Sequence, residues 1–128
     1  MVIIEILWHV RKGKEPAFLE AWRTKFTVSD RSKLVGEFLC RPNDQVEERY
    51  KTWRVADFNE PSEDVMPFVN VALWDSIEGF QEEISKYIPA PGASKPDFEI
   101  ARYRIVLEPT AWRIGGSELP HNDSPGTR

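Results

Sequence analysis

The sequence has few of the residues that build covalent or metal-stabilised frameworks. Its 128 residues include one cysteine, Cys40, and two histidines, His9 and His121. A single cysteine excludes an intramolecular disulfide framework and a cysteine-based zinc site, and it suits a reducing compartment. The two histidines are separated by most of the chain, and no carboxylate stands at ligand spacing from either. We therefore expect a cytoplasmic protein that binds no metal.

The sequence also lacks a long hydrophobic run and an excess of positive charge. Its apolar N-terminal stretch, residues 2–10, is too short to span a bilayer and has no signal-peptide layout. The formal net charge is -4, and acidic and basic residues are interspersed. No Gly-rich phosphate loop, Gly-x-Ser-x-Gly elbow or nucleotide fingerprint is present. We expect neither a membrane nor a nucleic acid as a partner.

Aromatic residues, by contrast, are plentiful. Five tryptophans and seven phenylalanines supply a core and also suit a pocket for a flat organic molecule. The length favours one domain that folds unaided. We expect this domain at residues 1–112 and a flexible C-terminal tail, rich in Gly, Pro, Ser and Asn, at residues 113–128.

Residues 67–88 predict a strand that runs directly into a helix. An almost continuous apolar run from Phe68 to Leu73 is typical of a strand covered on both faces. Asn70 interrupts this run and has the same strand parity as Trp74. Because a buried amide needs hydrogen-bond partners, we expect Asn70 to be paired within the fold or to contact a ligand. Asp75 is predicted to cap the helix, which carries an apolar stripe and ends before two prolines. The stripe and the prolines are Ile77, Phe80, Ile84, Ile88, Pro89 and Pro91.

The remaining pattern predicts three further strands and one further helix. Residues 2–10, 34–41 and 99–108 are expected to be strands, and a helix is expected from Pro16 to about Val28. Residues 43–66 are an insertion, either a lid or pocket wall or a segment that only packs. The order is that of an α+β ferredoxin-like sandwich (βαββαβ). Its second sheet face would stay apolar and uncovered, which predicts a homodimer.

The segment Trp74-Asp75-Ser76-Ile77-Glu78-Gly79-Phe80 forms a W-x-S-x-E-x-F pattern. With the element order, it resembles the dimeric α+β barrel superfamily, and within it the antibiotic biosynthesis monooxygenase (ABM) domain. The resemblance covers residues 1–41 and 67–109. That superfamily includes cofactor-independent monooxygenases of polyketide phenols, haem-degrading enzymes, cyclases and proteins without known activity, so the fold alone does not fix the reaction.

The resemblance implies candidate site residues. Trp74 stands where haem-degrading members have a pocket tryptophan, but residues 76–97 contain no histidine to serve as a proximal haem ligand. Aromatic-oxidising members present Asn, Trp, Tyr and Arg side chains to a pocket between helices and sheet. Asn70, Trp74, Tyr103 and Arg104 are the candidates here by strand position.

His9 is the candidate base. The first and third strands of this fold are expected to be parallel neighbours, which would bring His9, at the end of its strand, near Trp74. An imidazole there can remove a phenolic or enolic proton. The alternative is a strand-end histidine bonded to a backbone carbonyl. Asn70 and Arg104 are expected to steady the developing anion, although a structural amide and a solvated arginine are the simpler alternatives.

The sequence therefore predicts a homodimeric, ABM-like, cofactor-independent monooxygenase acting on a small phenolic or polyketide-like aromatic compound. His9, Asn70 and Arg104 are its expected catalytic residues. Trp74, Trp53 in the insertion and Tyr103 are expected to contact the substrate. Two alternatives stay open: a cyclase or isomerase that uses the same pocket, and a non-catalytic protein that binds a small molecule.

Overall fold

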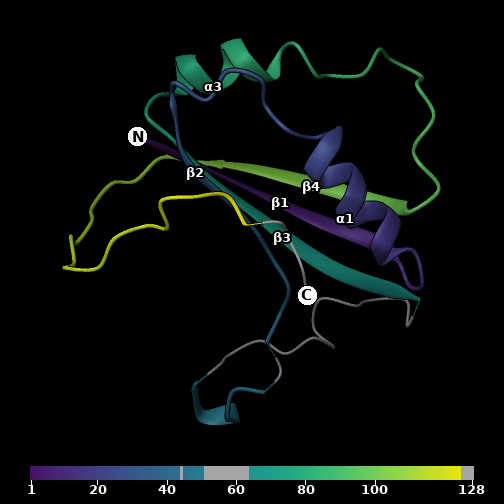
Figure 1. Cartoon of the computed structure of the whole chain (residues 1–128), viewed down its shortest axis with the longest axis horizontal. Coiled ribbons are helices and arrows are strands. Elements are labelled where there is room, and N and C mark those ends of the chain that lie inside the picture. The colour runs from purple at the N-terminus through teal and green to yellow at the C-terminus, as the bar shows by residue number, and fades with distance from the viewer. Residues whose placement is uncertain (44, 51–63, 125–128) are drawn as a thin grey trace.

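The computed structural model describes residues 1–43, 45–50 and 64–124. Its strands and helices alternate along the chain as the sequence predicts (Figure 1). The strands are β1 (Val2–Arg11), β2 (Leu34–Cys40), β3 (Val65–Trp74) and β4 (Glu99–Leu107). The helices are α1 (Glu15–Thr24), the short 3-10 helix η1 (Glu48–Tyr50) and α3 (Ile77–Ile84).

The strands form one antiparallel sheet in the order β2-β3-β1-β4. This order, with one helix after β1 and one after β3, confirms the ferredoxin-like α+β sandwich. The neighbourhood of the first and third strands is also confirmed, but their predicted parallel direction is wrong. Val2 of β1 lies opposite Trp74 of β3, and His9 lies opposite Pro67.

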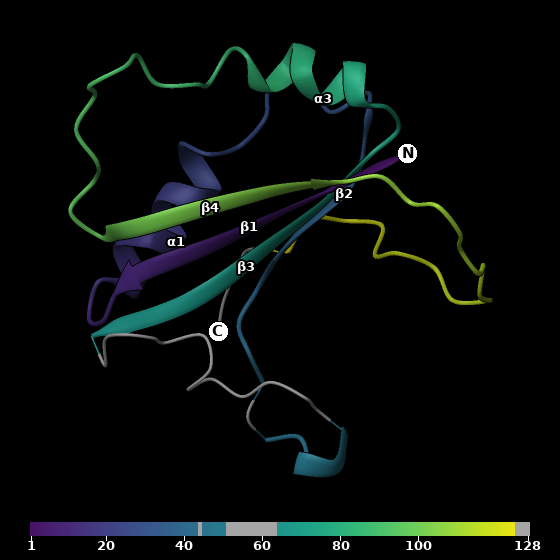
Figure 2. The same cartoon turned by 180° about the vertical axis from the view of Figure 1, so that it is seen from behind.

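The two helices α1 and α3 lie on the same side of the sheet (Figures 1 and 2). We call this side the helix face and the other the open face. Side chains of even-numbered β1 residues are buried on the helix face, in two clusters beneath the helices. One cluster includes Ile4, Trp74 and Phe80, and the other includes Trp8 and Phe18. Period-2 burial along β1 is what the sequence pattern predicts.

Both helices are shorter than their apolar stripes suggest. α1 ends at Thr24, although Phe26 and Val28 still pack against the core from the loop that follows. α3 ends at Ile84, five residues before Pro89. The apolar spacing continues beyond both helix ends because a turn or loop also places side chains against the sheet.

The cap of α3 is Ser76, and the prediction of Asp75 is wrong. The Ser76 backbone is extended, and its hydroxyl oxygen accepts a hydrogen bond from the Gly79 N–H at 3.0 Å. Asp75 instead lies one residue outside, where its own N–H donates to the Lys33 carbonyl oxygen. Both residues are good capping types, so the sequence alone does not decide between adjacent positions.

β3 begins at Val65, inside the range assigned to the insertion. Pro67 lies within this strand, at a point beyond the Cys40–Val69 pair where β2 ends. Proline is tolerated there because that side of β3 is no longer paired with β2. Residues 51–63 of the predicted insertion lie outside the described residues.

The tail returns to the body of the domain. Asp123 forms an ion pair with Arg31 at 2.8 Å, and Leu119 lies against Gly36 of β2. The segment between them and β4 swings away from the sheet and carries Trp112 and Ile114, which are 69% and 86% exposed (Figure 1).

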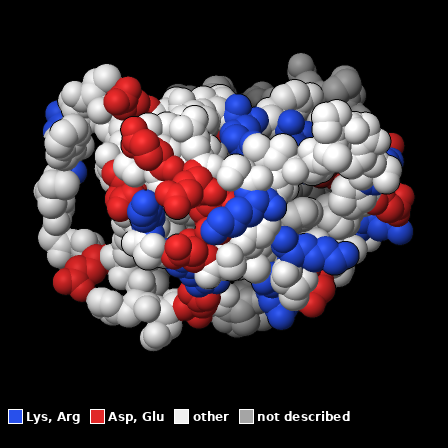
Figure 3. Space-filling model, turned by 90° about the horizontal axis from the view of Figure 1, so that it is seen from above, with Lys and Arg blue, Asp and Glu red and all other residues white. Residues whose placement is uncertain are grey.

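Charge is mixed over the surface seen in Figure 3, where acidic and basic side chains lie side by side. Among the described residues, no helix has the length and apolar character needed to cross a membrane. In the same part of the chain, no group of three or more His, Cys, Asp or Glu residues is arranged to hold a metal ion.

Candidate functional site

A chain of hydrogen bonds crosses the helix face and joins α1, β3 and β2. The Trp22 indole Nε1–H donates to Asn70 Oδ1 at 2.8 Å. Asn70 Nδ2 in turn donates to Glu37 Oε1 at 2.9 Å. The central Asn70 is 2% exposed. A buried amide with both ends paired fixes the relative positions of the helix and the two strands.

The chemistry of the partners decides the orientation of the Asn70 amide. An indole N–H only donates a hydrogen bond, so the amide oxygen must face Trp22. A carboxylate only accepts, so the amide nitrogen must face Glu37. A flipped amide would lose both contacts. The position of the Glu37 carboxylate is therefore coupled to α1 through one rigid side chain.

Glu37 lies on the second strand of the sheet and is half-buried. Burial raises the pKa of its carboxyl group, while the Asn70 hydrogen bond and the charge of Arg31 oppose that rise. Within the described residues, Glu37 makes no ion pair. An acidic side chain on a mainly apolar face, without a contacting cation, is costly for stability and is suited to proton transfer.

Arg104 lies in the same row of the sheet as Asn70. Ile6 of β1 stands between them, opposite Asn70 on one side and Arg104 on the other. Partial burial, and secondarily the charge of Arg102, lowers the pKa of Arg104. Arg102 is bound to Glu99 at 3.1 Å and stacks over Trp8, whereas no described carboxylate pairs with Arg104. Arg104 is thus available to an anionic ligand.

Trp74 is a core residue at the far end of β3. It is 2% exposed, and its ring meets Phe80 of α3 edge-on, with 5.9 Å between ring centroids. It also borders a small hollow of about 20 Å³ beside Lys33 and Gly79. That volume holds about one water molecule. In this conformation, the hollow is too small for an aromatic substrate.

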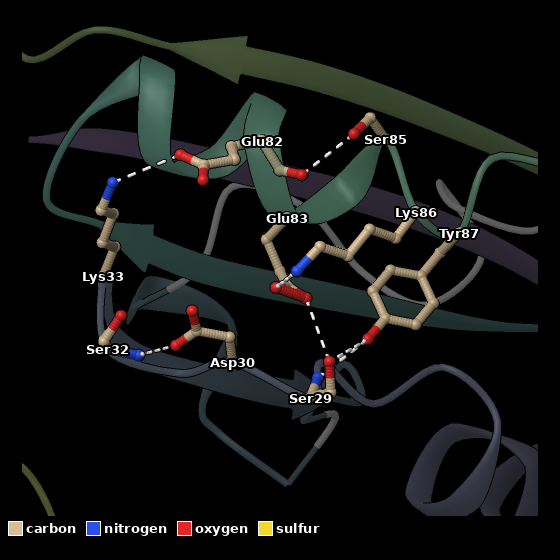
Figure 4. Close-up of polar contacts among 9 residues, drawn as sticks. All are labelled: Ser29, Asp30, Ser32, Lys33, Glu82, Glu83, Ser85, Lys86 and Tyr87. Atoms are coloured by element: carbon tan, nitrogen blue, oxygen red, sulfur yellow. Dashed lines mark hydrogen bonds and ion pairs between the residues drawn. The ribbon is translucent and has the colours of Figure 1, made fainter.

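The rim of this hollow is a set of polar contacts between α3 and the loop that precedes β2 (Figure 4). Glu83 binds Lys86 at 2.7 Å, and Tyr87 donates its hydroxyl proton to Ser29 Oγ at 2.9 Å. Lys33 reaches Glu82 at 3.3 Å. The Lys86 hydrogen bond is the largest cause of the lowered pKa of Glu83. Each of these groups has a protein partner, so the contacts hold the loop to α3.

His9 and Tyr103 lie together on the open face, away from Asn70. Their rings meet edge-on with 5.4 Å between centroids, and Tyr103 is 56% exposed. Burial lowers the pKa of His9, whose buried Nε2 has no hydrogen-bond partner among the described residues. The expected approach of His9 to Trp74 is wrong, because His9 lies seven positions along antiparallel β1, about 23 Å, from Val2, which lies opposite Trp74.

The structure thus brings together Asn70 and Arg104 on the helix face, with Trp74 in the same layer, and separates them from His9 and Tyr103. Trp53 lies outside the described residues. Two residues that sequence reasoning did not single out, Trp22 and Glu37, complete the site. The sequence did contain a signal for Glu37, which is the one charged residue in the otherwise apolar strand β2. It contained no signal for the contact between Trp22 and Asn70, because that contact depends on how α1 crosses the sheet.

No family model and no curated protein matches this sequence. Solved structures do match it in fold. A crystal structure of a MhuD mutant with two manganese protoporphyrin IX molecules bound per active site aligns with a TM-score of 0.57 and 18% identity. The alignment covers 91% of this chain and all of that one. A Bacillus cereus protein with the provisional name antibiotic biosynthesis monooxygenase aligns with a TM-score of 0.52 and 15% identity. That alignment covers 91% of this chain and 98% of the other. The chain therefore shares the ferredoxin-like α+β fold of these two structures.

Proposed function

We propose that this chain is a homodimeric enzyme that oxidises a small phenolic or polyketide-like compound with O2 and without a metal or organic cofactor. The supporting observation is the polar set on the helix face, where Asn70 and Glu37 lie in one layer with Arg104, a cation that no described carboxylate pairs with. The assignment to oxygen chemistry comes from likeness of fold and is an analogy.

In such a reaction the substrate itself supplies the electrons. A phenol that reacts with O2 can give a quinone and water: one oxygen atom becomes the new carbonyl, and the other leaves as water with two hydrogens from the substrate. Removing the phenolic proton first makes the ring electron-rich. We propose that Arg104 balances the negative charge of that phenolate. We propose Trp74 as part of the pocket wall, which requires its hollow to widen when substrate binds.

A haem-dependent reaction fits these residues poorly. The chain has two histidines. His9 lies on the open face, and His121 is a tail residue next to Glu118, with a side chain that is 82% exposed. Neither offers an axial ligand to a porphyrin on the helix face. Porphyrin binding by MhuD is therefore not carried over to this chain.

The open face supports the homodimer. On β4, Tyr103, Ile105 and Leu107 are 56%, 55% and 39% exposed and lie in one row along the strand. A second copy of the sheet is the partner we propose, because it offers the same apolar surface. His9 and Tyr103 would then face the partner. The cytoplasm is the compartment we propose, since the single cysteine suits a reducing environment.

Oxygen consumption with a panel of polycyclic phenols tests this function. We expect oxygen uptake that matches quinone formation, and we expect Arg104→Gln to reduce kcat/KM by about tenfold or more, as loss of a charge-assisted contact does. The matched control is Arg113→Gln, a tail arginine, which should leave the rate unchanged. Product without oxygen uptake would indicate cyclisation or isomerisation, and binding without any product would indicate a binding protein. Either result contradicts the proposal.

A further inference from the structure

We propose that Glu37 is the catalytic base of this site and accepts the proton from the hydroxyl group of a bound phenol or enol. The inference rests on the proposed function and adds the group that starts its chemistry. It replaces His9 in that role, because His9 lies on the other face of the sheet and Glu37 lies on the same face as Asn70 and Arg104.

The geometry leaves one carboxylate oxygen for a substrate. Asn70 holds Oε1 at 2.9 Å, and Oε2 makes no hydrogen bond to another described residue. The side chain is half-buried, so a ligand hydroxyl can approach from the solvent side. Since Asn70 is itself fixed by Trp22, the free oxygen keeps its position without the substrate. A prepositioned acceptor is what general-base catalysis requires.

The surroundings keep Glu37 out of an ion pair. The groups that face it from α1 and β3, Trp22 and Asn70, are neutral. Arg31 is the positive group whose charge acts on it, and the Arg31 guanidinium is bound to Asp123 at 2.8 Å and to Thr27 at 3.3 Å. Burial outweighs these favourable contacts and raises the pKa of Glu37 above its ordinary value. A carboxylate with a raised pKa is a stronger base than an exposed one.

The proton step balances without any other reactant. The O–H bond of the substrate breaks, a new O–H bond forms at Glu37 Oε2, and the electron pair stays on the substrate oxygen. Asn70 continues to donate to Oε1 during this change. The protonated carboxyl group then returns the proton to solvent on its exposed side.

The first test needs no substrate, because the Trp22 indole reports on Glu37 through Asn70. We expect the Trp22 Nε1–H signal in an NMR pH titration to shift with a midpoint above the ordinary glutamate pKa. Glu37→Gln should abolish that titration. The control is Glu20→Gln, which changes an exposed glutamate on α1, the helix that carries Trp22. This variant should retain the titration of the indole signal. An indole signal that is constant with pH, or that titrates unchanged in Glu37→Gln, would overturn the coupling.

The second test uses 2-naphthol, whose ring hydrogen at C1 exchanges with deuterium from D2O by way of the ionised form. We expect the wild-type protein to bind it and to accelerate this exchange, measured by NMR. Glu37→Gln should bind 2-naphthol within about threefold of the wild-type affinity but lose the acceleration. An equal exchange rate in Glu37→Gln overturns the role of Glu37. Accelerated exchange without oxygen uptake for any phenol would overturn the proposed function and leave the role of Glu37 as base supported.

Discussion

Asn70 connects three elements through one side-chain amide that is 2% exposed. Its partners are Trp22 of α1 and Glu37 of β2, which lie 48 and 33 residues away along the chain. The amide therefore positions Glu37 as well as stabilising the fold.

Replacing Asn70 by alanine should destabilise the fold strongly. The Asn70→Ala variant leaves the Trp22 N–H and the Glu37 carboxylate without partners on the helix face. We expect the free energy of unfolding to fall by about 2–4 kcal/mol, as measured by urea denaturation. Asn122→Ala in the exposed tail is the control and should change it by less than about 0.5 kcal/mol. A similar small loss for Asn70→Ala would contradict the described contacts.

Glu37 should make stability depend on pH in a defined direction. Its pKa is raised in the folded state, so folding favours the protonated form. Its contribution is fully present below the unfolded pKa and is lost as pH rises through the folded pKa. Relative to Glu37→Gln, the wild-type protein should therefore lose stability as pH increases above the ordinary glutamate value. Urea denaturation of both proteins across that range measures the difference. If the difference in stability between the two proteins stays constant with pH, or changes in the opposite direction, the pKa of Glu37 is not raised in the folded state.

At the scale of elements, periodicity predicted the existence and order of strands and helices better than their ends. β1, β2 and β4 begin and end within one residue of their expected bounds. The helices end early, because apolar residues continue to pack after the last helical turn. Strand direction was beyond the sequence pattern. The first and third strands were expected to be parallel, whereas the chain reverses between β2 and β3, so that β3 pairs antiparallel with both β2 and β1.

The cap of α3 offers a direct test at this scale. Ser76→Ala removes the hydroxyl that accepts from the Gly79 N–H. We expect a loss of about 1 kcal/mol in the free energy of unfolding, measured by thermal or urea denaturation. Asp75→Asn serves as the neighbouring control and should cost less than half as much. If Asp75→Asn costs more than Ser76→Ala, the cap assignment is wrong.

At the scale of the whole molecule, the two faces of the sheet differ, because both helices cover one face and leave the other open. The helix face carries the polar set, and the open face carries exposed apolar side chains, for which we propose a second copy as the partner. Sequence parity predicted that Asn70 and Trp74 share a face of their strand, as the structure shows. It could not join β1 to the correct residues of β3, which is why His9 was expected in a site on the opposite side.

A charge on the open face should separate the two copies. Ile105 is 55% exposed on β4, and Ile105→Glu would place a carboxylate in the proposed interface. We expect the sedimentation coefficient to change from that of a dimer to that of a monomer. Ile88→Lys, a substitution at a 64% exposed residue after α3, should remain dimeric. A wild-type protein that sediments as a monomer would contradict the homodimer itself.

We propose that ligands bind on the helix face around Trp22, Asn70 and Glu37. An NMR titration of the protein with 2-naphthol tests this, following the Trp22 indole N–H and the His9 ring signals together. A Trp22→Phe variant assigns the indole signal. We expect the Trp22 signal to shift with saturation while the His9 signals stay in place. Shifts confined to His9, with Trp22 unchanged, would place the site on the open face and contradict binding on the helix face.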